Sequence, residues 1–410
     1  MKAALDITVL YVAEAGVFYY RYNLVRALLE LPTHHEFTLL DYFPLEGGWA
    51  RREPDEVKSL LEGRANVRRI RGLKDRKLAR LGFVQKYGLL PLVRPVDRLL
   101  EMPWQCLCRF ETDRRIRRHL GDVDLFHSSD VLYHALRGAK NVATIYDLTA
   151  LLFPEYHTAR VRQAQAKKYR FVQHKADAVI TISESARRDA IEYLKLDPDR
   201  VFVIYGGVDP AYRPLPQGFV AMALGTWGLA PQSYILHLGT IEPRKNLVCL
   251  IQAYHRLKKS MPNAPKLVQV GTKGWLCDDV FEQVHHLDLE DSVTFLGRIE
   301  SHWLPALYNG ARLFVYPSIY EGFGLPPLEA MACGVPVITS NTSSLPEVVG
   351  DAGVMVDPCD VPQLAEVMER LLVDEQESAR LGQRGLERAR RFTWQTTARE
   401  TVRIYEKLIG

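Results

Sequence analysis

Residues 316–331 read YPSIYEGFGLPPLEAM, and the four residues 313–316 that lead into this stretch form an apolar run typical of a buried strand. Two glycines follow, then two adjacent prolines, after which the apolar spacing becomes helical. Glycines let the backbone approach a ligand closely, and prolines favour the first turn of a helix, whose free amides attract an anion. The stretch therefore predicts a strand, a turn and a helix, with a phosphate site at the turn.

Two glutamates belong to this turn and helix. Glu329 lies about one turn inside the predicted helix, where a carboxylate can accept hydrogen bonds from a ribose diol. Glu321 lies at the mouth of the turn, within reach of the group beyond the phosphate. The alternative interpretation is a helix start with two solvated glutamates, and the spacing alone leaves both interpretations open.

A second turn of the same kind precedes it in the chain. Residues 234–238 predict a strand, and GTIEPRKN at 239–246 follows directly. Arg244 and Lys245 could neutralise a diphosphate, the arginine as a fork and the lysine as a point charge. Two adjacent cations at the start of a helix oppose its dipole, which indicates an anion nearby. A solvated basic turn is the alternative for this motif taken alone.

Short β-branched runs alternate with helical patterns along most of the 410 residues, as in parallel sheets covered by helices on both faces. The remaining strands are expected at 7–12, 36–41, 67–70, 124–127, 142–146, 178–182, 201–204, 267–270, 293–296 and 335–339. The chain is too long for one core, so we expect an α/β protein with two doubly wound domains facing across a cleft. The first spans 1–209, a linker rich in glycine and proline spans 210–232, and the second spans 233–393. Residues 394–410 predict a helix that crosses back to the first domain.

The composition is that of an ordinary globular chain, with 47% hydrophobic and 25% charged residues. Its formal charge of +4 is too small to make nucleic acid the expected partner. Six scattered cysteines lack the spacing of metal ligands, which predicts neither disulfides nor structural zinc. Asp6 and Glu14 interrupt the apolar N-terminal stretch, and no uncharged apolar run approaches the roughly 18 residues of a membrane-spanning helix. We therefore expect a cytoplasmic protein.

The positive charge is concentrated between Arg64 and Leu120, where sixteen basic residues stand against five acidic ones. This stretch carries +11 and the rest of the chain −7. Apolar residues are interleaved with the cations, as in a surface helix that rests on anionic lipid headgroups, which predicts a peripheral contact at the inner face of the membrane. Solvated helices over the first sheet are the open alternative. Nucleic acid is disfavoured because no binding motif accompanies the charge.

The two turns resemble those of the retaining glycosyltransferases of family 4, which have two Rossmann-like domains in the GT-B arrangement. EGFGLPPLE resembles that family's pair of glutamates separated by seven residues, and GTIEPRKN resembles its diphosphate-binding turn. Further matches are TIYDL at 144–148, TISES at 181–185, IYGGVD at 204–209, VGTKGW at 270–275 and SSLPE at 343–347. The likeness covers nearly the whole second half of the chain and is patchy in the first.

The resemblance implies transfer of a sugar from a nucleotide sugar with the anomeric configuration retained. Lys245 and Arg244 would hold the donor diphosphate, and Glu329 the ribose. The phosphate and donor sugar would contact Glu321 and the loop after it, Gly322, Phe323, Gly324 and Leu325. Further donor-binding positions that the resemblance implies are Gly16, Gly239, Gly271 and Arg298. Cations and amides would then stabilise the charge that develops on the departing phosphate.

On the acceptor side the chain departs from its relatives. Where they often carry a catalytic histidine, this chain has Tyr146 before Asp147, and a tyrosine with an ordinary pKa near 10 is a poor general base. His127, which ends a predicted strand, is the next candidate, with a structural role as its alternative. Relatives also have a glycine-rich loop after the first strand, where this chain has Gly16 alone. The implied catalytic set is Glu321, Lys245, Arg244, His127 and Asp147.

No cofactor is expected, because the nucleotide sugar is a co-substrate and the family usually requires no divalent metal. Two aspartate pairs could imitate a metal-binding motif, Asp122 with Asp124 and Asp197 with Asp199. The first pair leads into a predicted strand and the second lies in a turn between a helix and a strand, so we interpret both as structural.

The expected function is therefore transfer of mannose from GDP-mannose to a lipid-linked or polysaccharide acceptor in cell-surface glycan synthesis. The choice of mannose rests on family likeness. A glucosyl or N-acetylglucosaminyl transferase that uses a UDP-sugar is one alternative. The other is a non-catalytic subunit of a glycan assembly complex that binds sugar nucleotides or the membrane. The sequence carries no indication of the oligomeric state.

Overall fold

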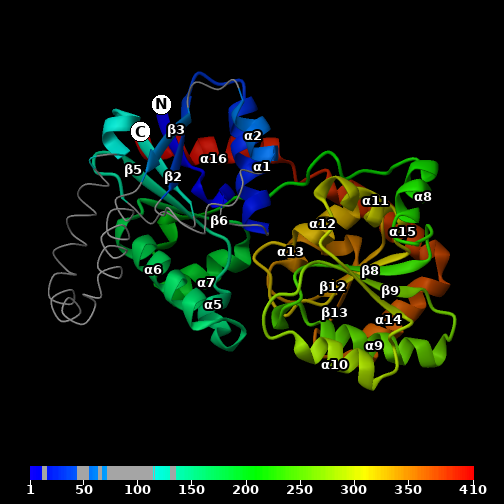
Figure 1. Ribbon diagram of the computed structural model, residues 1–410. Helices are drawn as coiled ribbons and strands as arrows, with labels where there is room; N and C mark the ends of the chain where they lie inside the picture. The colour runs from blue at the N-terminus through cyan, green and yellow to red at the C-terminus, as the bar shows by residue number, and fades with distance from the viewer. Residues whose placement is uncertain (12–15, 44–54, 63–66, 72–113, 115, 130–134) are drawn as a thin grey trace, which may run out of the picture.

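The computed structural model describes residues 1–11, 16–43, 55–62, 67–71, 114, 116–129 and 135–410. They form two α/β domains that lie side by side, each built on one parallel sheet with helices on both faces (Figure 1). The prediction of two doubly wound domains is thereby confirmed. Most of the basic stretch from Arg64 to Leu120 lies outside the described residues.

The sheet of the first domain has the strand order β3-β2-β1-β4-β5-β6-β7. Its strands are β1 (Lys2–Asp6), β2 (Glu36–Phe43), β3 (Val67–Arg71), β4 (Leu125–Ser128), β5 (Lys140–Ile145), β6 (Ala178–Thr181) and β7 (Val201–Val203). The helices around it are α1 (Gly16–Glu30), α2 (Asp55–Leu61), α5 (Thr149–Leu152), α6 (Ala159–Lys175) and α7 (Glu184–Leu194).

The first strand lies earlier in the chain than its prediction at 7–12. β1 ends at Asp6, and Thr8–Tyr11 form the 3-10 helix η1 instead. Oδ1 of Asp6 accepts hydrogen bonds from N and Oγ1 of Thr8, at 3.0 and 2.5 Å, so the chain turns directly after the strand. β1 pairs with β2 on one side and β4 on the other, and burial at the centre of a parallel sheet sustains an alanine-containing strand that lacks the β-branched pattern.

The sheet of the second domain has the strand order β10-β9-β8-β11-β12-β13. Its strands are β8 (Tyr234–Leu238), β9 (Lys266–Val270), β10 (Val293–Gly297), β11 (Leu313–Tyr316), β12 (Val337–Ser340) and β13 (Val354–Val356), the last of which the sequence pattern did not reveal. The helices are α9 (Leu247–Ser260), α10 (Asp278–His286), α11 (Leu304–Gly310), α12 (Leu325–Ala332), α13 (Leu345–Val349), α14 (Val361–Val373) and α15 (Glu375–Ala389).

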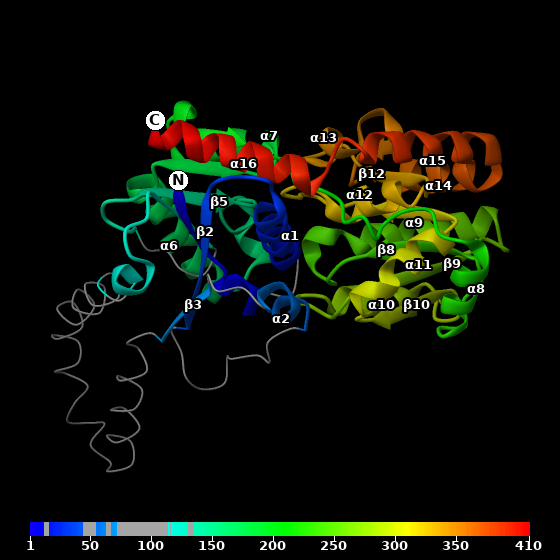
Figure 2. The same ribbon diagram turned by 90° about the horizontal axis from the view of Figure 1, so that it is seen from above.

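Helix α16 (Trp394–Ile409) leaves the second domain and packs against α1 of the first, as the red helix shows in both views (Figures 1 and 2). At its start the chain runs beside the first connection between the domains, where Val208 N donates a 3.0 Å hydrogen bond to Phe392 O. The expected linker at 210–232 contains helix α8 (Gln217–Gly225), whose Leu224 is fully buried. Over the described part of the chain, no helix combines the length and apolar character that crossing a membrane requires.

In each sheet the strand order reverses at one point, between β1 and β4 in the first and between β8 and β11 in the second. Loops that leave neighbouring strands at such a point turn to opposite faces, and the crevice between them is where ligands bind in open α/β sheets. β8 and β11 pair directly, with Leu313 opposite Ile235. The two turns at 239–246 and 317–324 follow these two strands, so the fold brings them to one edge.

Candidate functional site

Backbone contacts join the two turns that the sequence analysis singled out. Ile319 N donates to Arg244 O at 2.9 Å, and Nδ2 of Asn246 donates to Pro317 O at 3.1 Å. Asn246 adopts the left-handed conformation, φ 59°, which ends the short 3-10 helix η4 (Pro243–Lys245) and starts α9. The basic turn is thus fixed directly beside the loop that carries Glu321.

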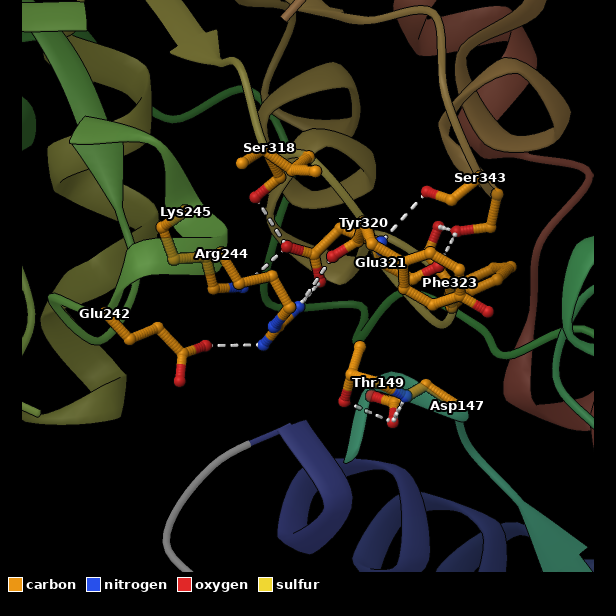
Figure 3. Close-up of polar contacts among 12 residues, drawn as sticks. Asp147, Thr149, Glu242, Arg244, Lys245, Ser318, Tyr320, Glu321, Phe323 and Ser343 are labelled. Carbon is orange, nitrogen blue, oxygen red and sulfur yellow. Dashed lines mark hydrogen bonds and ion pairs between the residues drawn. The ribbon is translucent and has the colours of Figure 1, made fainter. Parts of the chain in front are cut away.

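Two cations and two carboxylates converge at this point (Figure 3). Nζ of Lys245 lies 2.7 Å from Oε1 of Glu321 and donates to the hydroxyl of Tyr316 at 2.5 Å. Arg244 bridges the carboxylates, with Nη1 2.8 Å from Glu321 Oε2 and Nη2 2.6 Å from Glu242 Oε1. Because Lys245 and Glu321 are only 8% and 7% exposed, these contacts are formed largely out of water.

The charges in this cluster hold one another ionised. Burial alone would raise the pKa of Glu321, but Arg244 and Lys245 lower it to about 2. Burial and the neighbouring Arg244 lower the pKa of Lys245 from its ordinary value, against the opposing effect of Glu321. Lys245 keeps its proton because the neighbouring carboxylates stabilise its charge. A phosphate that binds here could take over that role from the carboxylates.

The loop after Glu321 has a backbone that is fixed by serine side chains. Ser344 Oγ donates to the carbonyl oxygens of Glu321 and Phe323, at 2.9 and 2.7 Å, and Ser343 Oγ accepts from the amide of Glu321 at 2.9 Å. Gly324 has φ 110°, a conformation that a residue with a Cβ rarely adopts, and it precedes α12 without a side-chain cap. α12 begins with Leu325, Pro326 and Pro327, and the two prolines carry no N–H. Leu328 N donates to Gly324 O at 3.3 Å, so the start of α12 offers an anion the amide of Leu325 and fewer amides than the sequence analysis expected.

Glu329 lies on α12 in a cavity of about 210 Å³ between the domains. Residues from both domains line it, among them Tyr19, Tyr22, Asp209, His302 and Leu325. Burial raises the pKa of Glu329 to about 8, although the hydroxyl of Tyr308 donates to it at 2.8 Å. A partly buried carboxyl at the edge of a cavity is a suitable partner for hydroxyl groups of a ligand.

Asp147 faces the cation cluster from the first domain (Figure 3). It follows β5, and its Oδ1 accepts from N and Oγ1 of Thr149 at 3.1 and 2.8 Å. Its charge acts across the domain boundary, since burial would lower the pKa of Arg244 but Glu321, Glu242 and Asp147 together raise it. The two domains touch here, because a Cβ on Gly322 would lie 2.1 Å from Tyr146 O.

His127 is placed differently from the acceptor-side position expected of it. It belongs to β4 and is fully buried, and its ring nitrogens contact the hydroxyls of Tyr405 and Thr144. Burial lowers its pKa well below the ordinary 6.5, so the imidazole is neutral at pH 7. The structural alternative is the one that this geometry supports, because α16 covers the end of β4 with Tyr405.

The remaining predicted donor-binding positions differ in how they relate to the cluster. Gly239 follows β8, and a Cβ there would lie 3.5 Å from Lys245 Cε. Gly271 has φ 138°, and a Cβ there would lie 2.0 Å from Gly239 O, so it lets the loop after β9 approach the basic turn. Arg298 is exposed after β10 and acts electrostatically on Tyr19. Gly16 begins α1, and nothing lies within 4 Å of its Cβ position.

Each of the two aspartate pairs has a member with a structural contact. Asp124 Oδ2 accepts from Lys2 N at 2.7 Å, and Asp197 caps a 3-10 turn by accepting from Asp199 N at 3.0 Å. Within the residues that the structure describes, no group of three or more His, Cys, Asp or Glu side chains could hold a metal ion.

Several contacts of the site escaped the sequence analysis. Glu242, Ser343 and Ser344 support the cluster, and all three lie in motifs that were quoted for their family likeness. Their neighbours in sequence give no sign of these contacts, which depend on loops from three strands meeting. The likeness of the motifs to a family was the signal that could have identified them.

Known protein families match both domains of the chain. The family model Glycosyltransferase Family 4 matches residues 15–212, and Glycosyl transferases group 1 matches residues 229–388. O-antigen chain mannosyltransferase B from Escherichia coli is 36% identical over 286 residues, which are 68% of this chain and 75% of that protein. Serotype-specific mannosyltransferase WbdA from Escherichia coli is 33% identical over 274 residues, 66% of this chain but only 34% of that protein.

A solved structure shows the same arrangement of domains. HepE from Anabaena, crystallised with UDP and glucose, superposes with a TM-score of 0.72 at 18% identity, over 99% of this chain and 100% of that one. At this identity the likeness concerns the fold, and it agrees with the GT-B arrangement that the sequence predicted. The two family models, the Escherichia coli relatives and the paired turns of the second domain agree: the chain belongs to glycosyltransferase family 4, and it is a glycosyltransferase of GT-B fold.

Proposed function

We propose that the protein transfers mannose from GDP-mannose with retention of the anomeric configuration. The observation that carries the proposal is the meeting of Arg244, Lys245 and Glu321 at the ends of β8 and β11, beside the uncapped start of α12. The choice of mannose is supported by the relative at 36% identity, which is named as a mannosyltransferase. The proposed chemistry follows from the charges in this cluster.

In this proposal Lys245 and Arg244 bind the donor diphosphate and displace their contacts with Glu321. Negative charge grows on the diphosphate as the bond to the sugar breaks, and the preorganised cations, with the backbone amide of Leu325 at the start of α12, stabilise it. Glu329 accepts hydrogen bonds from the ribose in the cavity between the domains. Glu321, released from the cations, is free to bind hydroxyl groups of the donor sugar. Asp147 faces the same space from the first domain, which we propose binds the acceptor and call the acceptor domain.

The proposed acceptor is a lipid-linked oligosaccharide or a polysaccharide in cell-surface glycan synthesis. This acceptor is supported by the relative O-antigen chain mannosyltransferase B. The present protein covers 75% of the length of that relative. We also propose that transfer needs no divalent metal, because Arg244 and Lys245 supply the positive charge that a metal would otherwise bring to a diphosphate. Undiminished activity in the presence of EDTA would support metal independence, and restoration of lost activity by Mg²⁺ or Mn²⁺ would overturn it.

The peripheral membrane contact through Arg64 to Leu120 remains part of the proposal. Arg114 and Arg118 are exposed where the stretch is described, in a position to meet a surface. Flotation with vesicles that contain anionic lipid, at low and moderate salt, tests the contact. The double variant Arg114→Glu, Arg118→Glu should bind less than the parent, and equal binding by both proteins would contradict this anchor.

The donor is tested by a thermal-shift screen with GDP, UDP, GDP-mannose, UDP-glucose and UDP-N-acetylglucosamine. A ligand that binds only the folded state raises Tm, so GDP and GDP-mannose should raise it and the uridine compounds should not. Slow release of GDP from GDP-mannose would then show turnover, and NMR of the product would show the anomeric configuration. Stabilisation by UDP-sugars alone, or an inverted product, would overturn the proposal.

A further inference from the structure

One carboxylate of the second domain binds the start of a helix of the first. Glu347 lies on α13, and its Oε2 and Oε1 accept from the backbone amides of Glu184 and Ser185, both at 2.7 Å. These are the first two residues of α7, an eleven-residue helix. The hydroxyl of Tyr205 donates to Oε2 at 3.1 Å. We call these three bonds the interdomain cap.

The interdomain cap completes the hydrogen bonding of α7. A helix begins with amides that have no partner inside the helix, and here Ser183 Oγ satisfies the amide of Ala186 at 3.0 Å. Glu347 satisfies the two amides before it. A carboxylate at this end also interacts favourably with the helix dipole, so the bonds are charge-assisted. The charge of Glu347 also affects Tyr205, because burial and Glu347 together raise the pKa of this tyrosine to about 12.

Within the second domain, Glu347 lies on α13, which begins directly after the two serines that support Glu321. Arg388 Nη2 donates to Glu347 O at 2.7 Å and fixes α13 in the second domain. Three and four residues before Glu347, Ser344 and Ser343 hold the carbonyl and the amide of Glu321 at 2.9 Å each. A single short segment thus contacts the cation cluster at one end and the acceptor domain at the other.

We infer that Glu347 is a positioning residue for glycosyl transfer: it joins the domains in the closed arrangement and holds the Glu321 loop beside the acceptor domain. The side chains that the proposed function assigns to the donor, those of Lys245, Arg244, Glu321 and Glu329, all belong to the second domain, whereas Asp147 comes from the first. Loss of the interdomain cap should therefore leave the donor bound to the second domain and move it away from Asp147 in the first. The inference rests on family membership and requires no particular donor.

The first test compares Glu347→Gln with Glu366→Gln, which changes an exposed glutamate of α14. The glutamine side chain has one acceptor oxygen where glutamate has two. Its NH2 group would face one of the two backbone N–H donors of α7 and cannot accept from it. Small-angle scattering without donor should show a larger radius of gyration for Glu347→Gln than for the parent and Glu366→Gln. With the donor that the thermal-shift screen identifies, kcat should fall about tenfold, as expected for loss of charge-assisted bonds, while KM for the donor changes less than about twofold.

The second test removes the same bond from the opposite side. Glu184→Pro deletes the amide that Glu347 accepts, and proline is tolerated at the first position of a helix. Ser183 already has the extended backbone, φ −159° and ψ 161°, that a residue before proline prefers. Glu184→Ala is the matched control, because it loses the same side chain and keeps the amide. Glu184→Pro should reproduce the larger radius and the lower kcat, and Glu184→Ala should not.

The variants should also be non-additive when Glu184→Pro and Glu347→Gln are combined, since both act on one bond. The inference is overturned if Glu184→Pro behaves as Glu184→Ala in both scattering and kcat. It is also overturned if folded Glu347→Gln keeps the parent radius and kcat. Scattering needs no nucleotide sugar, so an error in the proposed donor would appear in the ligand screen and leave this result intact.

Discussion

Lys245 Nζ lies 2.7 Å from Oε1 of Glu321, so the lysine proposed to bind the diphosphate is held by a carboxylate of the adjacent loop. Both side chains are buried, and the hydroxyls of Tyr316 and Ser318 complete their hydrogen bonding at 2.5 and 2.6 Å. In the proposed function, donor binding exchanges one anion for another on the same cation. The proposal thus couples release of Glu321 to binding of the donor.

Replacement of Lys245 should abolish most of the leaving-group stabilisation. We expect Lys245→Ala to lower kcat by about 100-fold to 1,000-fold, the range for loss of one preorganised charged donor. Release of nucleoside diphosphate from the donor measures this directly. Lys259→Ala removes an exposed lysine of α9 and should keep the parent kcat. A Lys245→Ala enzyme with parental kcat would exclude the lysine from the reaction.

A methyl group at Gly322 should force the domains apart. Its Cβ would lie 2.1 Å from Tyr146 O and 3.3 Å from Asp147 Cβ, both in the first domain. We expect Gly322→Ala to lower kcat by about 100-fold, because a shift near 1 Å in the reacting groups has effects of that size. Gly218→Ala is the control, since nothing lies within 4 Å of its Cβ position. Equal kcat in the two variants would show that the domain contact at Gly322 is unimportant for transfer.

Glu329 should make stability depend on pH. Its pKa is raised by burial from 4.5 to about 8, so the folded protein keeps a proton that the unfolded chain has released. The contribution of this group to the free energy of unfolding is therefore highest below pH 4.5 and is lost as the pH rises through about 8. Urea unfolding between about pH 5 and pH 9 should show a smaller decline for Glu329→Gln than for Glu366→Gln. Identical declines would mean that Glu329 is ionised in the folded state.

His127 should affect stability and leave chemistry unchanged. Tyr405→Phe removes the hydroxyl that contacts its ring, and we expect a loss of about 1 kcal/mol in the free energy of unfolding with unchanged kcat. Burial keeps the folded-state pKa of His127 well below 6.5, so its contribution is present above pH 6.5 and is lost as the pH falls below that value. Tyr193→Phe, at an exposed tyrosine, should leave stability unchanged. A fall in kcat for Tyr405→Phe at full folding would return His127 to the candidate active site.

The turns of the second domain could be predicted because their information is local. The basic turn at 239–246 and the glycine-proline stretch at 316–331 each follow a strand whose apolar run is easily recognised, and the observed β8 and β11 end where expected. The strand order then brings the two turns together at the point where it reverses. For these two turns, the local sequence pattern and the strand order are together sufficient to predict that they meet.

Features that depend on distant contacts could not be predicted in the same way. β1 carries the pattern KAALD, which is a strand only because neighbours cover both its edges. His127 was assigned to the acceptor side because nothing in its surroundings indicates Tyr405, which lies 278 residues later. Glu347 was visible in SSLPE, but its partners on α7 belong to the other domain. These contacts join residues that are far apart in the sequence, so they exist only in the folded chain.

The return of α16 means that the chain passes between the domains twice. The two passages run side by side, joined by the hydrogen bond from Val208 N to Phe392 O and by a β-bridge between Val208 and Thr393. A single tether would let one domain swivel freely about the other, whereas a paired ribbon bends along one direction and resists twist. The paired passages therefore limit how the domains can turn about one another, and the contacts of Glu347 with the start of α7 and of Gly322 with Tyr146 lie on the two domains that they join.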